Sequence, residues 1–589
     1  MSSPIELLRR NFRKYLILSN QLNPFIEPEK AQSLLQKDGT LESVDYSCRL
    51  LTGTGWTPYN HLLAMHVLLP ERSDDVRKML AVWERLDPVS DNWWWQEIGT
   101  PHWLCRTLIL LDEYVQPGSK IHEILSRSAI RDVLTGQNLV WVAGVEVAKG
   151  LLYNDESMVK RGRDIINAEI TIAENEGLKA DWSFHQHGPQ PQFGNYGLSW
   201  FLDMTMWCAV FSGTAYAFDA EKVKLLENFY LHGQKWMLLR DSFDVNNCGR
   251  QFQEEFPQHK YRAISFAAEC LRQFGFLQDE TPDLYGCKAW PLSGLMMSRR
   301  PDYCFSLRMC SRHIFGTECC GQENILGRYA ADGATMIYPG YASVQDSLVL
   351  RNWRQIPGTT ELMNTGDLMP LSRYAGEWLW NAGGDCGCWG EGDLGAAWMK
   401  QRTECITADK AWFCLRDTVI CMGRNISSTK NDTVATTVLQ EKTPARLLLN
   451  GKEATAGKTV AATPAEVTAG AMKYIFPVSG NLHIDLQEVT SSWQVVSGEC
   501  DPTEHTGTVA AIYFDHGIMP QNAEYCYMIT PADKAAEKVE FINTPCALGI
   551  KSPEVTMIAF FEAGSVENIT MEKAGLYIAQ SGHEIRQYI

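Results

Sequence analysis

The spacing of apolar residues changes once along this chain of 589 residues, and the change limits the folds that the chain can adopt. Up to about residue 295, apolar residues recur every three or four positions, as they do on one face of a helix. Beyond that point the period becomes two, in short runs of β-branched and aromatic residues between turn residues. A helical part followed by a strand part predicts an α+β protein built from separate domains.

The segments with each period predict the architecture of the two parts. Successive amphipathic helices predict an α/α toroid or a helical solenoid, and the lack of a repeat of fixed length disfavours the solenoid. The short strands predict a large antiparallel sandwich. The helical segments are 75–87, 106–115, 121–134, 161–173, 221–239 and 261–276. The strand segments are 433–440, 446–451, 473–478, 482–489, 492–498, 508–514, 524–530 and 556–564.

The composition excludes several classes of protein. A net charge of −17 argues against a nucleic-acid-binding protein, for which a basic surface is expected. An anionic substrate stays compatible with it, because the local field in a cleft matters more than the net charge. The 18 cysteines are too sparse for a disulfide scaffold and lack paired CxxC spacing. We therefore expect buried thiols, such as Cys105 and Cys208, and no metal site.

The N-terminal sequence lacks an apolar stretch followed by a small-residue cleavage site, and no run of about 18 apolar residues suggests a membrane span. As written, the chain is expected to remain in the cytoplasm, away from membranes. A chain from which a signal peptide had been removed would look the same.

The stretch DWSFHQHGPQPQFGNYG, residues 181–197, is the strongest candidate for a functional loop. Its prolines and glycines are incompatible with a long helix, and a loop rich in His, Gln and Tyr is typical of a site. It carries His187 and, nine residues later, Tyr196. His185 is the competing imidazole, and a structural role is the alternative for any single histidine.

Two earlier segments carry further candidates. DNWWWQEIGTP contains Trp93, Trp94 and Trp95, whose consecutive side chains must point in different directions. Stacking on a sugar ring and burial are both compatible with them. In LTGQN, Asn138 stands at the mouth of a helix, where an N-cap or turn is the ordinary role.

Later segments add charged candidates. NNCGRQFQEEF places Arg250 after a glycine, where its guanidinium can bind a carboxylate or sulfate through two parallel hydrogen bonds. A surface salt bridge is the alternative. CCGQENILGRYAADG contains Glu323 and Asn324 in a turn-like context, and RNWRQIPGTT joins Trp353 and Arg354 to a rigid turn.

In their order along the chain, these segments resemble polysaccharide lyase family 8, which contains the hyaluronate, chondroitin AC and xanthan lyases. The matching segments include NWWWQEIGTP, TGQN, SFHQHGPQPQFGNYG, QENILGRYAADG and WRQIPGTT, and sandwich segments follow them to the C-terminus. HQHGPQ is most similar to the chondroitin AC side of the family. The resemblance implies an N-terminal α/α toroid over residues 1–295, an antiparallel β-supersandwich over 296–530 and a small C-terminal β domain over 531–589. Members of the family are usually secreted or periplasmic.

The resemblance also implies the residues of the site. The catalytic residues of the family match Asn138, His187, Tyr196, Arg250 and Glu323, and the tryptophans that stack on the sugar chain match Trp93 and Trp94. We expect further contacts with the substrate from Gln137, His185, Asn324 and Arg354.

The implied reaction is a β-elimination, which removes the C5 proton of a uronic acid and expels the sugar linked at C4. Asn138 can donate to the carboxylate, on which negative charge grows. Tyr196 can take the proton and return it to the leaving oxygen if a cation lowers its pKa from about 10. Arg250 is the expected cation and His187 a second one, and His187 is also an alternative base. The expected role of Glu323 is to hold the arginine or the histidine. The reaction needs no metal or organic cofactor, and the expected partner is an anionic polysaccharide bound by a monomer.

Two other functions stay open. A glycoside hydrolase needs two carboxyl groups, and Glu97, Asp181 and Glu323 are available for it. A carbohydrate-binding protein would use the tryptophans without turnover. Hyaluronate, chondroitin sulfates and xanthan-like chains are all compatible substrates. Where the family often has another basic residue after the arginine, this chain has Glu254 and Glu255, which favours a weakly sulfated or unsulfated substrate.

Overall fold

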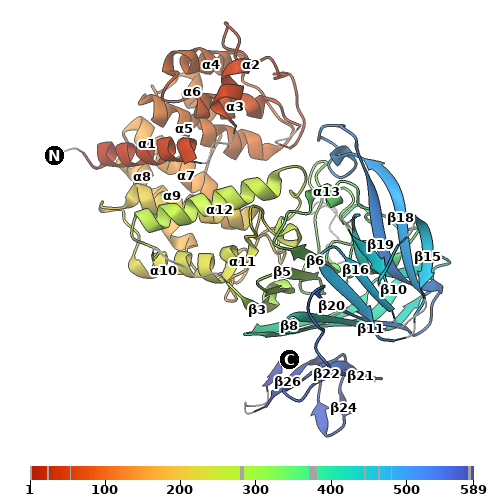
Figure 1. Cartoon of the computed structure of the whole chain (residues 1–589). Helices are drawn as coiled ribbons and strands as arrows, with labels where there is room; N and C mark the ends of the chain where they lie inside the picture. The colour runs from red at the N-terminus through yellow and green to blue at the C-terminus, as the bar shows by residue number, and fades with distance from the viewer. Residues whose placement is uncertain are drawn as a thin grey trace. The chain divides into compact units, whose positions relative to one another are not determined.

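The computed structural model describes the chain except for residues 1–2, 23–25, 53–54, 279–283, 371–380, 444–445, 455, 462–464, 479, 582–585 and 589. It divides into two compact units, which we call the helical unit and the strand unit (Figure 1). The helical unit comprises Met1–Gln186, Gln192–Lys235 and His259–Thr281. The strand unit comprises His187–Pro191, Trp236–Gln258 and Pro282–Ile589. The loop 181–197 therefore contributes residues to both units.

Amphipathic helices cover the outside of the helical unit, as their apolar spacing predicts. In α4 (Ser73–Leu86), Val76 and Met79 are buried, and the opposite face carries exposed acidic residues such as Asp74. Further helices with residues in this unit are α1 (Pro4–Leu22), α2 (Pro28–Leu34), α3 (Pro58–Val67), α5 (Thr100–Leu111), α6 (Lys120–Leu125), α7 (Gly136–Tyr153), α8 (Glu156–Glu169), α9 (Tyr196–Phe211), α10 (Ala220–Phe229) and α12 (Phe256–Gln273).

The prediction of a helix over 121–134 is wrong beyond Leu125, where α6 ends. The hydroxyl of Ser126 donates to the carbonyl of His122 at 2.7 Å. A serine side chain that bonds to the nearby backbone competes with helix formation, and turns follow up to the start of α7.

Two helices, α7 and α9, form the interior of the helical unit. Both are buried on nearly all sides, and α7 packs against α5, α8 and α9. A helix buried all round has no polar face, so apolar spacing does not mark it in the sequence. Asn138 and Tyr196 thus lie at the N-terminal ends of two core helices that pack against each other.

The strand unit confirms the predicted antiparallel sandwich (Figure 1). A four-stranded sheet has the order β3-β4-β5-β6, a nine-stranded sheet the order β14-β13-β16-β17-β20-β11-β10-β9-β8, and a five-stranded sheet the order β15-β18-β19-β12-β7. Trp412, Phe514 and Tyr527 are fully or almost fully buried in one apolar core among these sheets. The strands of the unit up to β12 are β3 (Gly286–Trp290), β4 (Leu295–Arg299), β5 (Tyr303–Met309), β6 (Asp332–Pro339), β7 (Thr360–Leu362), β8 (Cys386–Glu391), β9 (Leu394–Arg402), β10 (Ile406–Leu415), β11 (Thr418–Ser428) and β12 (Thr433–Lys442). The next strands are β13 (Leu447–Leu449), β14 (Lys452–Glu453), β15 (Gly457–Ala461), β16 (Ala465–Ala469), β17 (Met472–Phe476), β18 (Leu482–Ser491), β19 (His505–Ile518) and β20 (Ala523–Pro531).

One predicted strand is wrong. Residues 492–498 contain the 3₁₀ turn Trp493–Val495, and the buried side chains of Trp493 and Val496 lie three positions apart. That spacing suits a helical turn, whereas a strand buries every second residue.

The C-terminal residues form a separate sheet in the order β21-β22-β23-β26-β27, beside a β24-β25 pair. Leu548 and Ile578 of this sheet share an apolar cluster with Phe413 and Met528 of the nine-stranded sheet. The strands are β21 (Glu540–Thr544), β22 (Ala547–Lys551), β23 (Val555–Phe560), β24 (Gly564–Val566), β25 (Ile569–Met571), β26 (Gly575–Gln580) and β27 (Arg586–Tyr588). The division into three domains stays a prediction, and β3 begins ahead of the expected boundary at residue 295. Each helix among the described residues is too short or too polar to cross a membrane.

Candidate active site

The N-terminal end of α7 is fixed by Gln186, from the loop of residues 181–197. The backbone N–H of Gln137 donates to Oε1 of Gln186 at 2.9 Å, and Nε2 of Gln186 donates to the carbonyl of Thr135 at 3.3 Å. Gly136 has a φ of 54°, and a Cβ at this position would stand 2.3 Å from Oε1 of Gln186. Glycine therefore permits this close approach of the loop to the helix.

Asn138 lies in the first turn of α7, as its place at the mouth of a helix predicts. The N-cap is Thr135, so the alternative of an N-cap role for Asn138 is wrong. Its side chain is 8% exposed, and the amide atom placed as Oδ1 forms no hydrogen bond with any described residue. Because the two ends of an amide exchange by a flip, this end can also present the NH₂ group. A buried polar group without a protein partner needs one, and a bound ligand can supply it.

Tyr196 is the first residue of α9, which corrects the expectation that it shares an irregular backbone with His187. Gly197 makes this start possible, because a Cβ there would stand 2.8 Å from the Cβ of Phe184 and 2.9 Å from the carbonyl oxygen of Gln192. The dipole of a helix favours a negatively charged side chain at its N-terminal end. A phenolate at Tyr196 would have that charge.

The three consecutive tryptophans point in different directions, as expected. Trp95 is buried, whereas Trp93 is 38% exposed and can stack on a ligand. Trp94 packs edge-on against Trp141, with 5.0 Å between the ring centroids, and the ring of Trp141 lies 5.8 Å from that of Tyr196. Aromatic rings therefore connect the tryptophan segment to Tyr196.

Two residues that we expected to contact the substrate lie inside the helical unit. Gln137 is fully buried, and its Nε2 donates to Oδ2 of Asp203 at 2.7 Å. His185 is 5% exposed and belongs to β2 (Phe184–His185), which pairs with β1 (Gly177–Leu178). Contact of either side chain with the substrate stays a prediction.

In the strand unit, His187 is held by Glu318. Nδ1 of His187 lies 2.7 Å from Oε2 of Glu318, and the two side chains are almost buried. His187 has a φ of 62°, a conformation that is uncommon outside glycine and recurs at functional sites. The carboxylate thereby fixes the orientation of the imidazole.

Arg250 is bound by two carboxylates, so the alternative of a surface salt bridge is wrong. Its Nη1 pairs with Oε1 of Glu318, and its Nε donates to Oε2 of Glu323 at 2.8 Å. The side chain of Gln251 donates to the other oxygen of Glu323 at 3.1 Å. Glu323 therefore holds the arginine, whereas Glu318 contacts His187 and Arg250 at the same time.

Glu318 is ionised in this arrangement. Burial by itself raises the pKa of Glu318, but the charges of His187 and Arg250 and their hydrogen bonds lower it, and the result lies well below the ordinary value. The carboxylate therefore stays charged at neutral and mildly acidic pH, where it keeps both side chains attached.

Arg308 of β5 joins the two loops that carry these groups. Its Nη1 donates to the carbonyl of Asn246 at 2.8 Å, and its Nη2 donates to the carbonyl of Gly316. Asn246 lies four residues before Arg250, and Gly316 lies two residues before Glu318. Burial lowers the pKa of Arg308 to about 10. The guanidinium thus fixes one loop relative to the other.

The side chains of Asn324 and Arg354 bind backbone groups. Nδ2 of Asn324 donates to the carbonyl of Glu318 at 3.0 Å, and Asn324 is only 2% exposed. Arg354 donates to the carbonyls of Thr365 at 2.5 Å and Gly366 at 2.8 Å. Both residues support loops of the strand unit, and their contact with the substrate stays a prediction.

The carboxylates of the hydrolase alternative already have partners. Glu97 forms a salt bridge with Arg131 at 2.5 Å, and Asp181 accepts hydrogen bonds from the backbone and hydroxyl of Ser183. Glu323 binds Arg250 as described above. The described residues contain no group of three or more His, Cys, Asp or Glu side chains that could hold a metal ion.

Sequence reasoning missed Glu318, Gln186 and Trp141. Glu318 stands five residues before Glu323, so its closeness to that candidate is a signal that could have identified it. Gln186 lies between the two candidate histidines, and Trp141 follows Asn138 by three residues, which is one turn of a helix. Their partners come from segments far apart in the chain, and local sequence does not reveal such contacts.

Two family models match the chain. Residues 70–252 match the polysaccharide lyase family 8 N-terminal alpha-helical domain, and residues 285–540 match the polysaccharide lyase family 8 super-sandwich domain. Chondroitinase-AC of Pedobacter heparinus is 27% identical over 559 residues, which cover 87% of this chain and 78% of that protein. A hyaluronate lyase of Thermasporomyces composti is 23% identical over 573 residues, which cover 82% of this chain and 71% of that protein.

Solved structures share the fold. A chondroitinase AC lyase described in complex with oligosaccharides has a TM-score of 0.83 at 23% identity, over 99% of this chain and 93% of that one. The Streptomyces coelicolor A3 chondroitin AC lyase in complex with chondroitin sulphate has a TM-score of 0.78 at 17% identity, over 98% and 91%. The fold of helical part, sandwich and C-terminal sheet is therefore that of these enzymes.

Proposed function

The chain belongs to polysaccharide lyase family 8 and is a carbon–oxygen lyase that acts on polysaccharide, and from this premise we propose that it cleaves a glycosaminoglycan of the hyaluronate or chondroitin type by β-elimination. The C5 proton of the uronic acid leaves, its electron pair forms the C4–C5 double bond, and the C4–O bond breaks. The leaving oxygen takes up a proton, and no water enters the products.

The observation that carries the proposal is the amide of Asn138, which has an end without a partner among the described residues. Removal of the C5 proton puts further negative charge on a carboxylate, so the reaction needs donors aimed at that group. An amide supplies a donor without a charge that would titrate. The positive end of the α7 dipole adds to the attraction for an anion.

Tyr196 is the base and then the acid in this proposal. A phenolate can take the C5 proton and, as a phenol, return it to the leaving oxygen. Its position at the start of α9 supports the negative charge. His187 stays the alternative base, because its imidazole is oriented by Glu318.

The strand unit supplies the positive charge. Arg250 is a permanent cation, and Glu318 and Glu323 hold its guanidinium by two edges. In this proposal Arg250 and His187 stabilise the negative charge of the tyrosine phenolate. Glu318 and Glu323 hold these two cationic side chains in position.

The proposed substrate is weakly sulfated or unsulfated. Glu254 and Glu255 follow Arg250 and would repel sulfate groups. The relatives described above are named chondroitinase-AC and hyaluronate lyase. Chondroitin and hyaluronate, the polymers in these names, both contain a uronic acid. The residue set supplies donor, base and acid by itself, so the proposed enzyme is a monomer that works without a cofactor.

The test is the ultraviolet absorbance of the unsaturated uronate during digestion of hyaluronate, unsulfated chondroitin, chondroitin sulfate and xanthan. We expect absorbance to rise with the first two and Tyr196→Phe to abolish the rise. Tyr216→Phe is the matched control, because the hydroxyl of Tyr216 binds Glu156 on another part of the helical unit. New reducing ends without absorbance would mean hydrolysis, and binding without any cleavage would mean a carbohydrate-binding protein. Faster turnover of highly sulfated chondroitin than of hyaluronate would contradict the proposed specificity.

A further inference from the structure

Asp203 is a buried carboxylate that the proposed chemistry does not use. It lies on α9, seven residues after Tyr196, and is 6% exposed. Seven residues are almost two full turns, so both residues occupy one face of the helix, about 10 Å apart along its axis. Burial of a carboxylate costs free energy unless the group has hydrogen-bond and ion-pair partners. The partners of Asp203 therefore show what the residue does in the fold.

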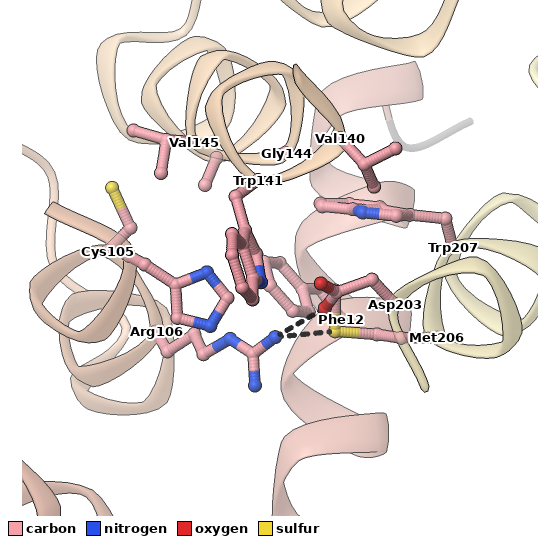
Figure 2. A pocket seen from close by; sticks show the side chains of 12 residues that line it. Phe12, Cys105, Arg106, Val140, Trp141, Gly144, Val145, Asp203, Met206 and Trp207 are labelled. Atoms are coloured by element: carbon pink, nitrogen blue, oxygen red, sulfur yellow. Dashed lines mark hydrogen bonds and ion pairs between the residues drawn. The ribbon is translucent and has the colours of Figure 1, made fainter. Parts of the chain in front are cut away.

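The partners of Asp203 come from two other helices. Its Oδ2 accepts from Nε2 of Gln137 at 2.7 Å. Its Oδ1 accepts from Nη2 of Arg106 on α5 at 3.2 Å, as Figure 2 shows. Trp141 of α7 lines the same small cavity as Asp203 (Figure 2). Gln137 and Trp141 are four residues apart on α7, on one face and on either side of Asn138 in the sequence.

The same cluster reaches the reacting group through an aromatic contact. Trp141, which lines a cavity together with Asp203, packs against the ring of Tyr196 with 5.8 Å between centroids. Asp203 thus binds the residue before Asn138 and lies near a residue that touches Tyr196. The cluster adjoins a cavity of about 10 Å³ lined by Arg106, Trp141 and Asp203, among others (Figure 2). That volume is too small for a sugar ring, so this cavity does not hold the substrate.

We propose that Asp203, paired with Arg106, is a positioning residue for the elimination: it ties the first turns of α7 to α9 and so sets Asn138 and Tyr196 relative to each other. The inference rests on the proposed function. A donor and a base that act on one uronate must keep their separation closely, and a misplacement of about 1 Å can cost about 100-fold in rate.

A second buried carboxylate on α7 provides a matched control. Glu146 is 5% exposed and forms ion pairs with Lys149 at 3.0 Å and with Arg161 of α8. It ties α7 to α8, away from α9. A carboxylate that merely stabilises the helical unit would resemble Glu146, so the two residues separate a positioning role from a structural one.

The experiment compares Asp203→Asn with Glu146→Gln in the full chain, with kcat, KM and Tm measured for both on the polymer that the wild type cleaves. We expect Asp203→Asn to lower kcat about 100-fold, with KM changed less than about threefold. We expect Glu146→Gln to lower Tm and to leave kcat within about threefold of the wild type. Equal losses of kcat in the two variants at equal Tm would overturn the proposal, as would an unchanged kcat in Asp203→Asn.

Gln137→Met keeps the proposal testable if Asp203→Asn fails to fold. It removes the contact of α7 with Asp203 but leaves the ion pair with Arg106 intact. We expect kcat to fall about tenfold with KM unchanged. A rise of KM alone would overturn the proposal, because it would mean that Gln137 binds the substrate. A wild-type chain without elimination on any polymer would overturn the proposed function instead.

Discussion

Asn138 and Tyr196 stand at the ends of two helices that are buried in apolar packing, whereas His187 and Arg250 stand on loops that carboxylates hold together. In the helical unit, the buried carboxylate of Asp203 binds Arg106 and Gln137, the neighbour of Asn138, rather than Asn138 or Tyr196 themselves. In the strand unit, Glu318 contacts both functional side chains directly.

The difference separates two ways of building a site. Packing of core helices fixes positions through many weak contacts, so the loss of one polar group at the helix end changes the stability little. A buried charge cluster depends on every member, because the removal of one leaves the others unpaired. Substitution of the amide of Asn138 should therefore affect the chemistry alone, and substitution of Glu318 should affect chemistry and stability together.

The largest expected effect on activity concerns Asn138, whose role in the chemistry can be measured separately from its contribution to stability. We predict that Asn138→Ala lowers kcat about 10²- to 10³-fold, as the loss of a donor at an oxyanion does. Tm should change little, because the amide has an unpaired end in the folded protein. Asn138→Asp should be more damaging than Asn138→Ala, since a carboxylate would repel the substrate. Full activity of Asn138→Asp would show that this side chain donates nothing.

Glu318→Gln should lower both activity and stability. Removal of one partner from a buried ion pair costs about 3–5 kcal/mol, because Arg250 keeps a charge that Glu318 no longer balances. Thermal unfolding and kcat measured together would reveal both losses. Glu323→Gln is the control, since it leaves His187 and Arg250 joined through Glu318. If Glu318→Gln kept the Tm of the wild type, the contrast between the two units would fail.

The acid stability of the protein should depend on Glu318. Its pKa in the folded state lies below the ordinary value of 4.5, so the ionised group stabilises the fold above that pH. This contribution is lost as the pH falls below 4.5 toward the lowered pKa. Unfolding in urea between neutral pH and pH about 3 should therefore show a steeper loss of stability for the wild type than for Glu318→Gln. Parallel curves for the two proteins would contradict the assigned pKa shift.

The smallest expected effect concerns Trp93. An exposed aromatic ring that stacks on a sugar contributes about 1 kcal/mol, so Trp93→Ala should raise KM about five- to tenfold and leave Tm unchanged. Trp95→Ala is the contrast, because Trp95 is buried and its loss should lower Tm. An unchanged KM in Trp93→Ala would remove Trp93 from the substrate site.

The sequence predicts best the parts of the fold that have one buried face or a β-branched and aromatic composition. The outer helix α4 and strand β17 alternate between buried and less buried residues, and their periods are visible. Strands β12 and β19 each contain a run of consecutive buried residues, where both faces are covered, and their β-branched and aromatic residues mark them instead. α9 lies in the core and carries Tyr196, but a helix that is apolar on every side has no period to find. The sequence predicts an irregular loop over residues 181–197. In the structure this loop ends at residue 195, where α9 begins.

The residue types and their order along the chain predict part of the candidate site, but they do not predict contacts between distant segments. The resemblance named Arg250 and Glu323, which the structure joins by a hydrogen bond. Glu318 escaped notice because its role depends on where two loops meet, and Arg308 of a different strand fixes that meeting. The sequence does not identify Asp203 either, because a single Asp in an apolar segment does not reveal its partners on α5 and α7.

The most direct test of the account is the mass of the products from a defined uronic-acid oligosaccharide. Elimination adds no water, so the masses of the two fragments must sum to that of the parent, with the unsaturated uronate on one of them. We predict this sum for the wild type and no fragments from Tyr196→Phe. A sum that exceeds the parent by one water molecule would establish hydrolysis and contradict the account.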